Sequence, residues 1–330
     1  MIYRDARGHF TKAPKVQPSF PQNPTYLLRT CDKNLKAYGG FQYPEKGYVE
    51  APDWKPKPVC GNGLHGLLMG KGNQSLLNWD ESEIWQILAV DPKTVAEIDV
   101  EFDGGKAKVP YAWVVLTGTR KEATDFLLAH GASFQEVPGI FQICGDNEKF
   151  VGGVKAVLAG GRNVELTGEN KSHLTGQSFA KLTGGDESVL FGKERSVLKG
   201  GDYCALIGGN DSQLSGGKHC EMSSGNDSVL TGGDFARMRG GSNSFLTGGY
   251  GSTLEGGDFS TLVSGESSVL ISGYKSTFKA GSDSTFVAIW TEGSRWFLVQ
   301  GRTNGTDLKP DVTYKINPHN QKFEEVVPKT

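Results

Sequence analysis

The stretch GGYGSTLEGGDFSTLVSGESSVL, residues 248–270, repeats one pattern every eight residues. The same octad runs without a slip from Lys155 to Trp290 in seventeen blocks, beginning with KAVLAGGR and ending with DSTFVAIW. Position 4 of each block is Leu, Met or Phe, and position 2 is small, with Val164 as its largest member. So short a period predicts a solenoid, in which each unit stacks only on its neighbours.

The spacing of positions 2 and 4 indicates a short strand. Side chains in a strand alternate between two faces, so positions 2 and 4 point inward together while positions 3 and 5 point outward. We therefore expect the position-4 residues to form a buried ladder along the interior. This predicted structural core includes Leu158, Leu166, Leu190, Leu206, Leu230, Leu254, Leu270 and Phe286.

Glycines at positions 6 and 7 close most octads, as in Gly200 and Gly201. We expect these glycines to adopt positive φ values and to turn a corner there. Two octads then make one sixteen-residue coil with two facing sheets, and seventeen octads make about eight coils. The predicted fold class is mostly β, with a two-sheet β-solenoid of octapeptide repeats over residues 141–286.

Three further segments flank the solenoid. Residues 1–24 contain four prolines and more basic than acidic residues, which predicts a flexible basic arm. Residues 25–140 combine strand patterns with the helical segment RKEATDFLLAHG, which predicts a small α+β domain that covers the first solenoid edge. Residues 287–330 contain the hairpin pattern VTYKINPHNQKFEEV and are expected to form a C-terminal β cap.

The charge balance and the hydrophobic pattern of the sequence argue against two kinds of partner, nucleic acids and membranes. The 330 residues include 35 basic and 37 acidic side chains, a net charge of -2, whereas nucleic-acid binders show a basic excess. A nucleic-acid partner is therefore not expected. No run of 18 apolar residues occurs, and the first residues lack a hydrophobic signal segment, so we expect no membrane partner and a cytoplasmic location.

The five cysteines are scattered and form no CxxC pair. This pattern is typical of free thiols in a reducing compartment. Cys204 and Cys220 lie sixteen residues apart in the small inward slot, so we expect them to be buried thiols stacked in neighbouring coils.

Octads sixteen residues apart stack in one column, so alternate octads form the two outer faces of the predicted solenoid. The octads that contain Val189, Ala205 and Val269 carry more apolar residues at the outward positions than the octads between them. An exposed apolar stripe suggests self-association, and we predict a homodimer packed along this face. The alternative is a scatter of single surface Val and Ile residues, which is ordinary for a β protein. The predicted dimer interface comprises Val189, Phe191, Ile207, Val269 and Ile271.

The loops of the predicted α+β domain gather reactive side chains within residues 39–72. Cys60 activated by His65 would be a nucleophile, although no orienting acid follows from the spacing. Cys31, Cys60 and His65 supply three zinc donors without a recognisable finger spacing, so no metal site is predicted. Neither a Walker pattern nor a GxGxxG after a strand is present.

The octads resemble the octapeptide repeats of bacterial ice nucleation proteins, and this resemblance implies a β-solenoid and an ice-binding function. The family implies long outward threonine ladders, whereas the outward positions here mix Thr253 and Thr261 with charged residues such as Arg237 and Arg239. The wider arrangement, with RTCDKNLKAYGGFQY and CGNGLHG before the octads, resembles uncharacterised phage and bacterial β-helix proteins.

The segment YLLRT, with the DKNL segment that follows, resembles the first conserved stretch of ADP-ribosyltransferase-like domains. The resemblance implies NAD as cofactor, with Arg29 holding it and Tyr43 or Trp54 stacking on the nicotinamide. Glu83 or Glu97 would orient the ribose. The family's catalytic glutamate has no assigned counterpart in this sequence.

Taken together, these patterns favour a non-catalytic binding or assembly protein without a cofactor, which forms a homo-oligomer and presents an N-terminal recognition domain to a protein partner. One alternative is an NAD-dependent transferase built around Arg29 and His65. The other alternative is an ice-binding protein.

Overall fold

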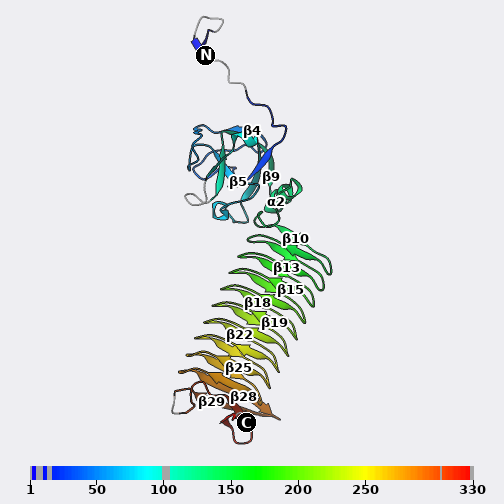
Figure 1. The fold of residues 1–330 in the computed structure, drawn as a ribbon, viewed down its shortest axis with the longest axis vertical. Helices are drawn as coiled ribbons and strands as arrows, with labels where there is room; N and C mark the ends of the chain where they lie inside the picture. Colours follow the sequence, from blue (N-terminus) through cyan, green and yellow to red (C-terminus); the bar gives the residue numbers. More distant parts are fainter. Residues whose placement is uncertain (1, 5–9, 13–16, 99–104, 305–306, 328–330) are drawn as a thin grey trace. The chain divides into compact units, whose positions relative to one another are not determined.

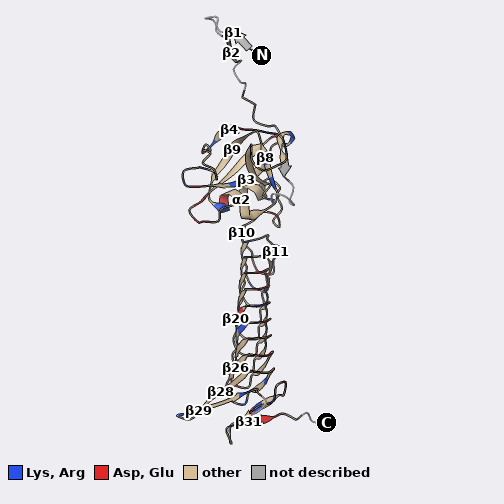
Figure 2. Cartoon of the chain, turned by 90° about the vertical axis from the view of Figure 1, so that its left-hand side faces the viewer, with Lys and Arg blue, Asp and Glu red and all other residues tan. Residues whose placement is uncertain are grey.

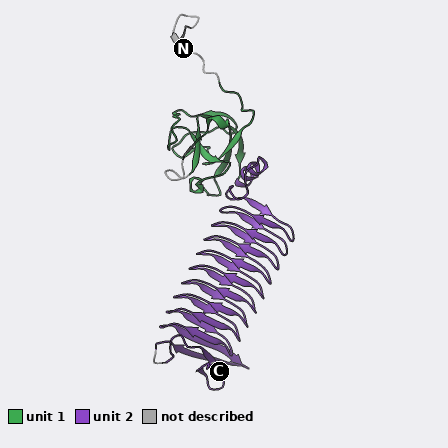
Figure 3. Ribbon diagram, in the orientation of Figure 1, with its two compact units in different colours: residues 1–119 green, residues 120–330 purple. Residues whose placement is uncertain are grey.

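The computed structural model describes residues 2–4, 10–12, 17–98, 105–304 and 307–327. The chain folds as two compact units, residues 1–119 and residues 120–330 (Figure 3). We call them the N-terminal unit and the solenoid unit. In the predicted arm, β1 (Ile2–Arg4) pairs antiparallel with β2 (Phe10–Lys12), and residues 1, 5–9 and 13–16 lie outside the described residues.

A seven-stranded antiparallel sheet forms the N-terminal unit, in the order β4-β9-β6-β3-β5-β8-β7. Its strands are β3 (Thr25–Cys31), β4 (Gly47–Glu50), β5 (Leu64–Leu68), β6 (Ile84–Val90), β7 (Ala96–Ile98), β8 (Lys106–Val109) and β9 (Tyr111–Gly118). Two single 3-10 turns, η1 (Gln74–Leu76) and η2 (Pro92–Thr94), lie in its loops. The core residues Leu27, Leu88 and Val109 are fully buried.

The predicted helix forms as α2 (Arg120–Ala129) and ends before Gly131, which has a φ of +89°. It belongs to the solenoid unit, so the division between the units falls at residue 119 rather than at the predicted residue 140. The N-terminal unit is therefore built on strands, and the helix begins the second unit.

The solenoid consists of two parallel stacks of very short strands (Figure 1). The even-numbered stack is β10 (Phe141–Ile143), β12 (Val157–Ala159), β14 (His173–Thr175), β16 (Val189–Phe191), β18 (Ala205–Ile207), β20 (Glu221–Ser223), β22 (Arg237–Arg239), β24 (Thr253–Glu255), β26 (Val269–Ser272) and β28 (Thr285–Glu292). The odd-numbered stack is β11 (Lys149–Val151), β13 (Glu165–Thr167), β15 (Lys181–Thr183), β17 (Val197–Lys199), β19 (Gln213–Ser215), β21 (Val229–Thr231), β23 (Phe245–Thr247), β25 (Thr261–Ser264) and β27 (Thr277–Ala280).

Each strand pairs with the strand sixteen residues later, so Leu158 lies beside Leu174 and Leu166 beside Leu182. This register confirms the predicted β-solenoid of sixteen-residue coils. The position-4 side chains face one another between the stacks. All eight residues named above as the structural core are at most 1% exposed.

The serines of position 2 form a second buried ladder, made of hydrogen bonds. The Ser188 hydroxyl accepts the backbone N–H of Ser172 at 3.2 Å and donates to the Glu169 carbonyl at 3.2 Å. The same pattern recurs at Ser212 and Ser228. Because a buried hydroxyl is costly without partners, these bonds explain why serine is tolerated inside the rod.

The predicted role of the glycines is wrong. Positive φ values occur at position 1, for example at Glu187 (56°) and Tyr203 (58°), and not at the glycines of positions 6 and 7. Those glycines are needed for close approach instead. A Cβ on Gly200 would meet the side chain of Cys204 at 2.8 Å, and a Cβ on Gly201 would overlap the Asp186 carboxylate of the preceding coil.

Both ends of the rod are covered within the solenoid unit. The strand β28 pairs antiparallel with β29 (Arg295–Arg302), and β27 pairs antiparallel with β30 (Tyr314–Asn317). The predicted C-terminal hairpin forms between β30 and β31 (Lys322–Glu325). At the other end, Phe134 accepts the N–H of Gly153 with its carbonyl and packs its ring 4.8 Å from that of Phe150.

Candidate functional site

We call the outward surface of strands β10 to β28 the even face and that of β11 to β27 the odd face. On the even face, five strands carry two outward apolar residues, whereas every odd-face strand carries at least one polar residue. The five pairs are Phe141 and Ile143, Val157 and Ala159, Val189 and Phe191, Ala205 and Ile207, and Val269 and Ile271.

The residues predicted for the dimer interface all lie on the even face. The side chains of Val189, Phe191, Ile207 and Val269 are 37–45% exposed, and Ile271 is half-buried. They fall into two apolar patches rather than one stripe, because three intervening strands are polar.

A charged band on β20, β22 and β24 separates the two patches. Figure 2 colours Lys and Arg blue and Asp and Glu red along the strands. Within the band, Arg239 Nη2 lies 2.8 Å from a Glu255 oxygen, and Arg237 Nη1 lies 3.7 Å from a Glu221 oxygen. These side chains are largely exposed, so the ion pairs contribute little to the stability of the monomer. They do give the even face a patterned charge that another surface can match.

The odd face presents a column of hydroxyl groups at the last position of its three-residue strands. The five hydroxyls lie in two blocks that Lys199 separates: Thr167, Thr183, Ser215, Thr231 and Thr247. Neighbouring strands in such a stack are about 4.8 Å apart, so the hydroxyls repeat at a regular spacing along a rigid sheet.

One corner of the solenoid carries an aromatic ladder that the sequence analysis overlooked. Tyr203, His219 and Phe235 occupy position 1 of successive coils, with neighbouring rings 4.9 and 5.0 Å apart and nearly parallel. The sequence could have predicted this ladder, because the three rings occupy the same octad position and lie sixteen residues apart. Residues so spaced lie one above the other in neighbouring coils, at the distance between paired strands.

The N-terminal unit contains a cavity of about 950 Å³, lined by residues of β3, β5 and the loops around them. Arg29, Tyr43 and His65, three residues of the predicted NAD site, line this cavity, and so does Glu83. Trp54 is not part of the lining and instead lies 5.6 Å from Lys108 Nζ. The side chain of Glu97 lies outside the described residues.

The Arg29 guanidinium is buried against an aromatic ring. Its Cζ lies 3.4 Å from the centre of the Tyr43 ring, so the arginine covers one face of that ring. Burial raises the pKa of the Tyr43 hydroxyl. Arg29 donates to the Thr30 carbonyl, while its Nε has no hydrogen-bond partner among the described residues.

The His65 imidazole lies on β5 directly opposite Lys108 of β8. Burial, followed by the positive charges of Lys106, Lys108 and Arg29, lowers the pKa of His65 to about 4. The ring is therefore neutral at pH 7. Its Nε2 is buried and has no hydrogen-bond partner among the described residues.

The structure does not join Cys60 and His65 as a nucleophile and its base. The exposed Cys60 sulfur instead accepts from Lys106 Nζ at 2.8 Å. Cys31 is buried, donates to Gln86 at 3.1 Å, and has a thiol pKa that burial raises. Within the described ranges, no group of three or more His, Cys, Asp and Glu residues is placed to hold a metal ion.

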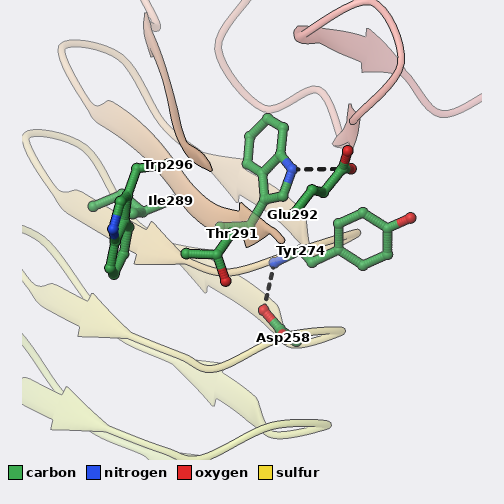
Figure 4. A pocket seen from close by; sticks show the side chains of 7 residues that line it. Asp258, Tyr274, Ile289, Thr291, Glu292 and Trp296 are labelled. Carbon is green, nitrogen blue, oxygen red and sulfur yellow. Dashed lines mark hydrogen bonds between the residues drawn. The ribbon is translucent and has the colours of Figure 1, made fainter. Parts of the chain in front are cut away.

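A shallow hollow of about 470 Å³ lies at the C-terminal end of the rod (Figure 4). Both of its carboxylates already have partners, since Asp258 accepts the Tyr274 N–H at 2.6 Å and Glu292 accepts the Trp290 indole N–H at 3.4 Å. The Asp258 bond repeats one found along the rod, where a position-8 carboxylate or amide holds the backbone of the next coil. The hollow thus follows from the coil architecture.

The repeats are similar in sequence to those of known proteins. Ice nucleation protein InaU of Pantoea ananas is 37% identical over 108 residues, covering 33% of this chain and 10% of that protein. Ice nucleation proteins of Enterobacter agglomerans and Pseudomonas syringae are 37% and 34% identical over 108 and 112 residues, covering 8% and 9% of their lengths. The solenoid is built from ice-nucleation-like repeats.

This similarity covers about a third of the chain, which spans about a tenth of the length of these relatives. None of the three is a phage protein. No protein-family model matches the chain, and no solved structure matches it. Among the described helices, none is long and apolar enough to cross a membrane.

Proposed function

We propose that this protein is a non-catalytic, ice-binding solenoid whose odd face orders water. The observation that carries the proposal is the hydroxyl column of the odd face on a scaffold of ice-nucleation-like repeats. A threonine offers a methyl group and a hydroxyl, and the stacked strands hold these groups in place before water arrives. Waters then bridge fixed hydroxyls without a further ordering cost for the protein.

Interruptions in the column limit the expected activity. Lys199 separates Thr183 from Ser215, and Val263 and Lys279 end the run beyond Thr247. An ammonium group is strongly hydrated and holds water in its own geometry. We therefore expect adsorption to ice rather than strong nucleation.

The test is the partition of the purified full chain into slowly grown ice. We expect enrichment in the ice fraction relative to an inert protein of similar size, and a clear loss of enrichment in Thr231→Val, which keeps the shape and removes a hydroxyl. Thr253→Val on the even face is the matched control and should partition like the parent chain. Exclusion of the parent chain from ice would overturn the proposal.

A second function, self-association through the even face, is favoured by its paired apolar residues and its charged band. In a parallel face-to-face pair, the arginines of β22 would oppose the same arginines of the second copy. An antiparallel pair with its two-fold axis between β20 and β22 avoids this repulsion. It sets Glu221 against Arg237 and Ser223 against Arg239, and it places apolar β16 on apolar β26.

Light-scattering mass tests this arrangement. We expect two chains for the parent protein and one chain for Phe191→Glu, while Phe245→Glu on the odd face stays at two chains. Arg237→Glu should weaken the pair, and the double variant Glu221→Arg with Arg237→Glu should restore it. A single-chain mass for the parent protein contradicts the proposal.

A further inference from the structure

The buried cations of the N-terminal unit point to a ligand, independently of the function proposed for the solenoid. Arg29 is only 7% exposed, lines the 950 Å³ cavity and has an unpartnered Nε. His65 lines the same cavity with an unpartnered, buried Nε2. We propose that this cavity binds a small molecule through a phosphate or carboxylate group held between Arg29 and His65.

The elements of the sheet bring these groups together. Strand β5, which carries His65, lies between β3 with Arg29 and β8 with Lys106 and Lys108. His65 and Lys108 lie directly opposite each other and share one face of the sheet, and Arg29 and Lys106 line the same cavity as His65. The electrostatic influence of all three cations on His65 agrees with this placement.

These cations lack anionic partners among the described residues. Lys108 donates to the carbonyls of Val59 and Gly61, Lys106 contacts a thiol, and Arg29 contacts a carbonyl and an aromatic ring. Burial of positive charge without a carboxylate is unfavourable. An anion entering the cavity would relieve this cost and would gain the planar donors of Arg29.

The rest of the lining indicates the remainder of the ligand. Asp32, Asp53 and Glu83 also line the cavity, so a molecule with several negative charges would meet repulsion there. Asp53 is already engaged by the Asn62 amide at 2.9 Å, and Asp32 accepts two backbone N–H groups. Apolar walls come from Phe41, Leu64, Leu76 and Leu77. A single anionic group on an apolar or aromatic body fits this distribution.

The first test is a titration of the full chain, labelled with ¹⁵N at histidine, with phenyl phosphate, benzoate or inorganic phosphate. Binding places a negative charge beside His65, so its ring signals should shift and its pKa should rise from about 4. A response to phenyl phosphate alone assigns a phosphate ligand, and a response to benzoate alone assigns a carboxylate ligand. No shift of His65 with any of the three compounds overturns the proposal.

The second test compares variants. Arg29→Met removes the charge, and we expect at least a tenfold loss of affinity for the compound that binds. Arg29→Lys keeps the charge but loses the planar donors, and it should also bind more weakly if Arg29→Met fails to fold. Arg295→Met, an exposed arginine of the solenoid unit, is the matched control and should bind normally. Unchanged affinity in folded Arg29 variants overturns the proposal.

Discussion

The two units of this protein use their residues in opposite ways. In the solenoid, one sequence pattern is repeated every eight residues, and the same contacts recur at Leu158, Leu166 and the later position-4 residues. In the N-terminal unit, each contact occurs once, as in the stack of Arg29 on Tyr43. Repetition makes a surface that is regular and rigid, whereas unique contacts make a cavity lined by many different side chains.

This comparison predicts that a core substitution in one unit leaves the other folded. Leu230→Ala removes a fully buried side chain from the ladder and should destabilise the solenoid unit by about 2–5 kcal/mol. Thermal unfolding followed by hydrogen exchange would show faster exchange in residues 141–286 alone. Val229→Ala, which alters the outward neighbour, is the control, and equal effects of the two changes would contradict the inward assignment of position 4.

The glycines of position 6 offer a sharper comparison within the solenoid. Gly200→Ala places a methyl group 2.8 Å from the Cys204 side chain, and we expect a loss of about 1–3 kcal/mol in denaturant unfolding. Lys199→Ala, one residue earlier and pointing outward, should have little effect on stability. If Gly200→Ala were harmless, close approach would not explain the glycine repeat.

The pH dependence of the N-terminal unit should come partly from His65. Its folded pKa of about 4 lies below its unfolded value, so the unfolded chain binds a proton first as the pH falls. Stability is complete above about pH 6.5 and declines between about pH 6.5 and 4. Because the ring is partly exposed, we expect a contribution of about 1–2 kcal/mol. His65→Gln should flatten this part of the pH profile of unfolding, and an unchanged slope would contradict the assignment.

The smallest effect is expected in the solenoid at lower pH. Hydrogen bonds from Lys218 and from the Tyr250 N–H lower the pKa of Asp234. A lowered carboxyl pKa gives stability that is present above the unfolded pKa of about 3.9 and is lost as the pH falls below it. Asp234→Asn keeps an oxygen acceptor for Tyr250, so its acid unfolding profile should be slightly shallower. A steeper profile in this variant would contradict the prediction.

The sequence predicts the solenoid well because the octad pattern occurs in seventeen consecutive blocks. The inward ladder and the coil length both follow from positions 2 and 4. The glycine conformation does not follow, because the neighbour that requires each glycine lies elsewhere in the coil, such as Cys204 beside Gly200, or in the preceding coil, such as Asp186 beside Gly201. The sequence pattern alone cannot distinguish a glycine that is needed for a positive φ from one that is needed because a Cβ would clash with a neighbouring atom.

The N-terminal cavity is only partly predictable for a related reason. Arg29, Tyr43 and His65 were singled out by type and resemblance, but the strand order β6-β3-β5-β8 is what places Lys106 and Lys108 beside His65. Those lysines belong to a four-residue strand with no distinctive motif. The aromatic ladder of Tyr203, His219 and Phe235 could be found by comparing position 1 of octads sixteen residues apart. It was missed because the residue type at position 1 varies widely along the solenoid.

The central claim is that the regularity of the odd face determines its affinity for ice, and the variant Lys199→Thr tests it most directly. This change joins the two hydroxyl blocks into one run from Thr167 to Thr247. Measured by partition into slowly grown ice, Lys199→Thr should be enriched more strongly than the parent chain, while Lys193→Thr in a turn should match the parent. Equal or weaker partition of Lys199→Thr would contradict the claim.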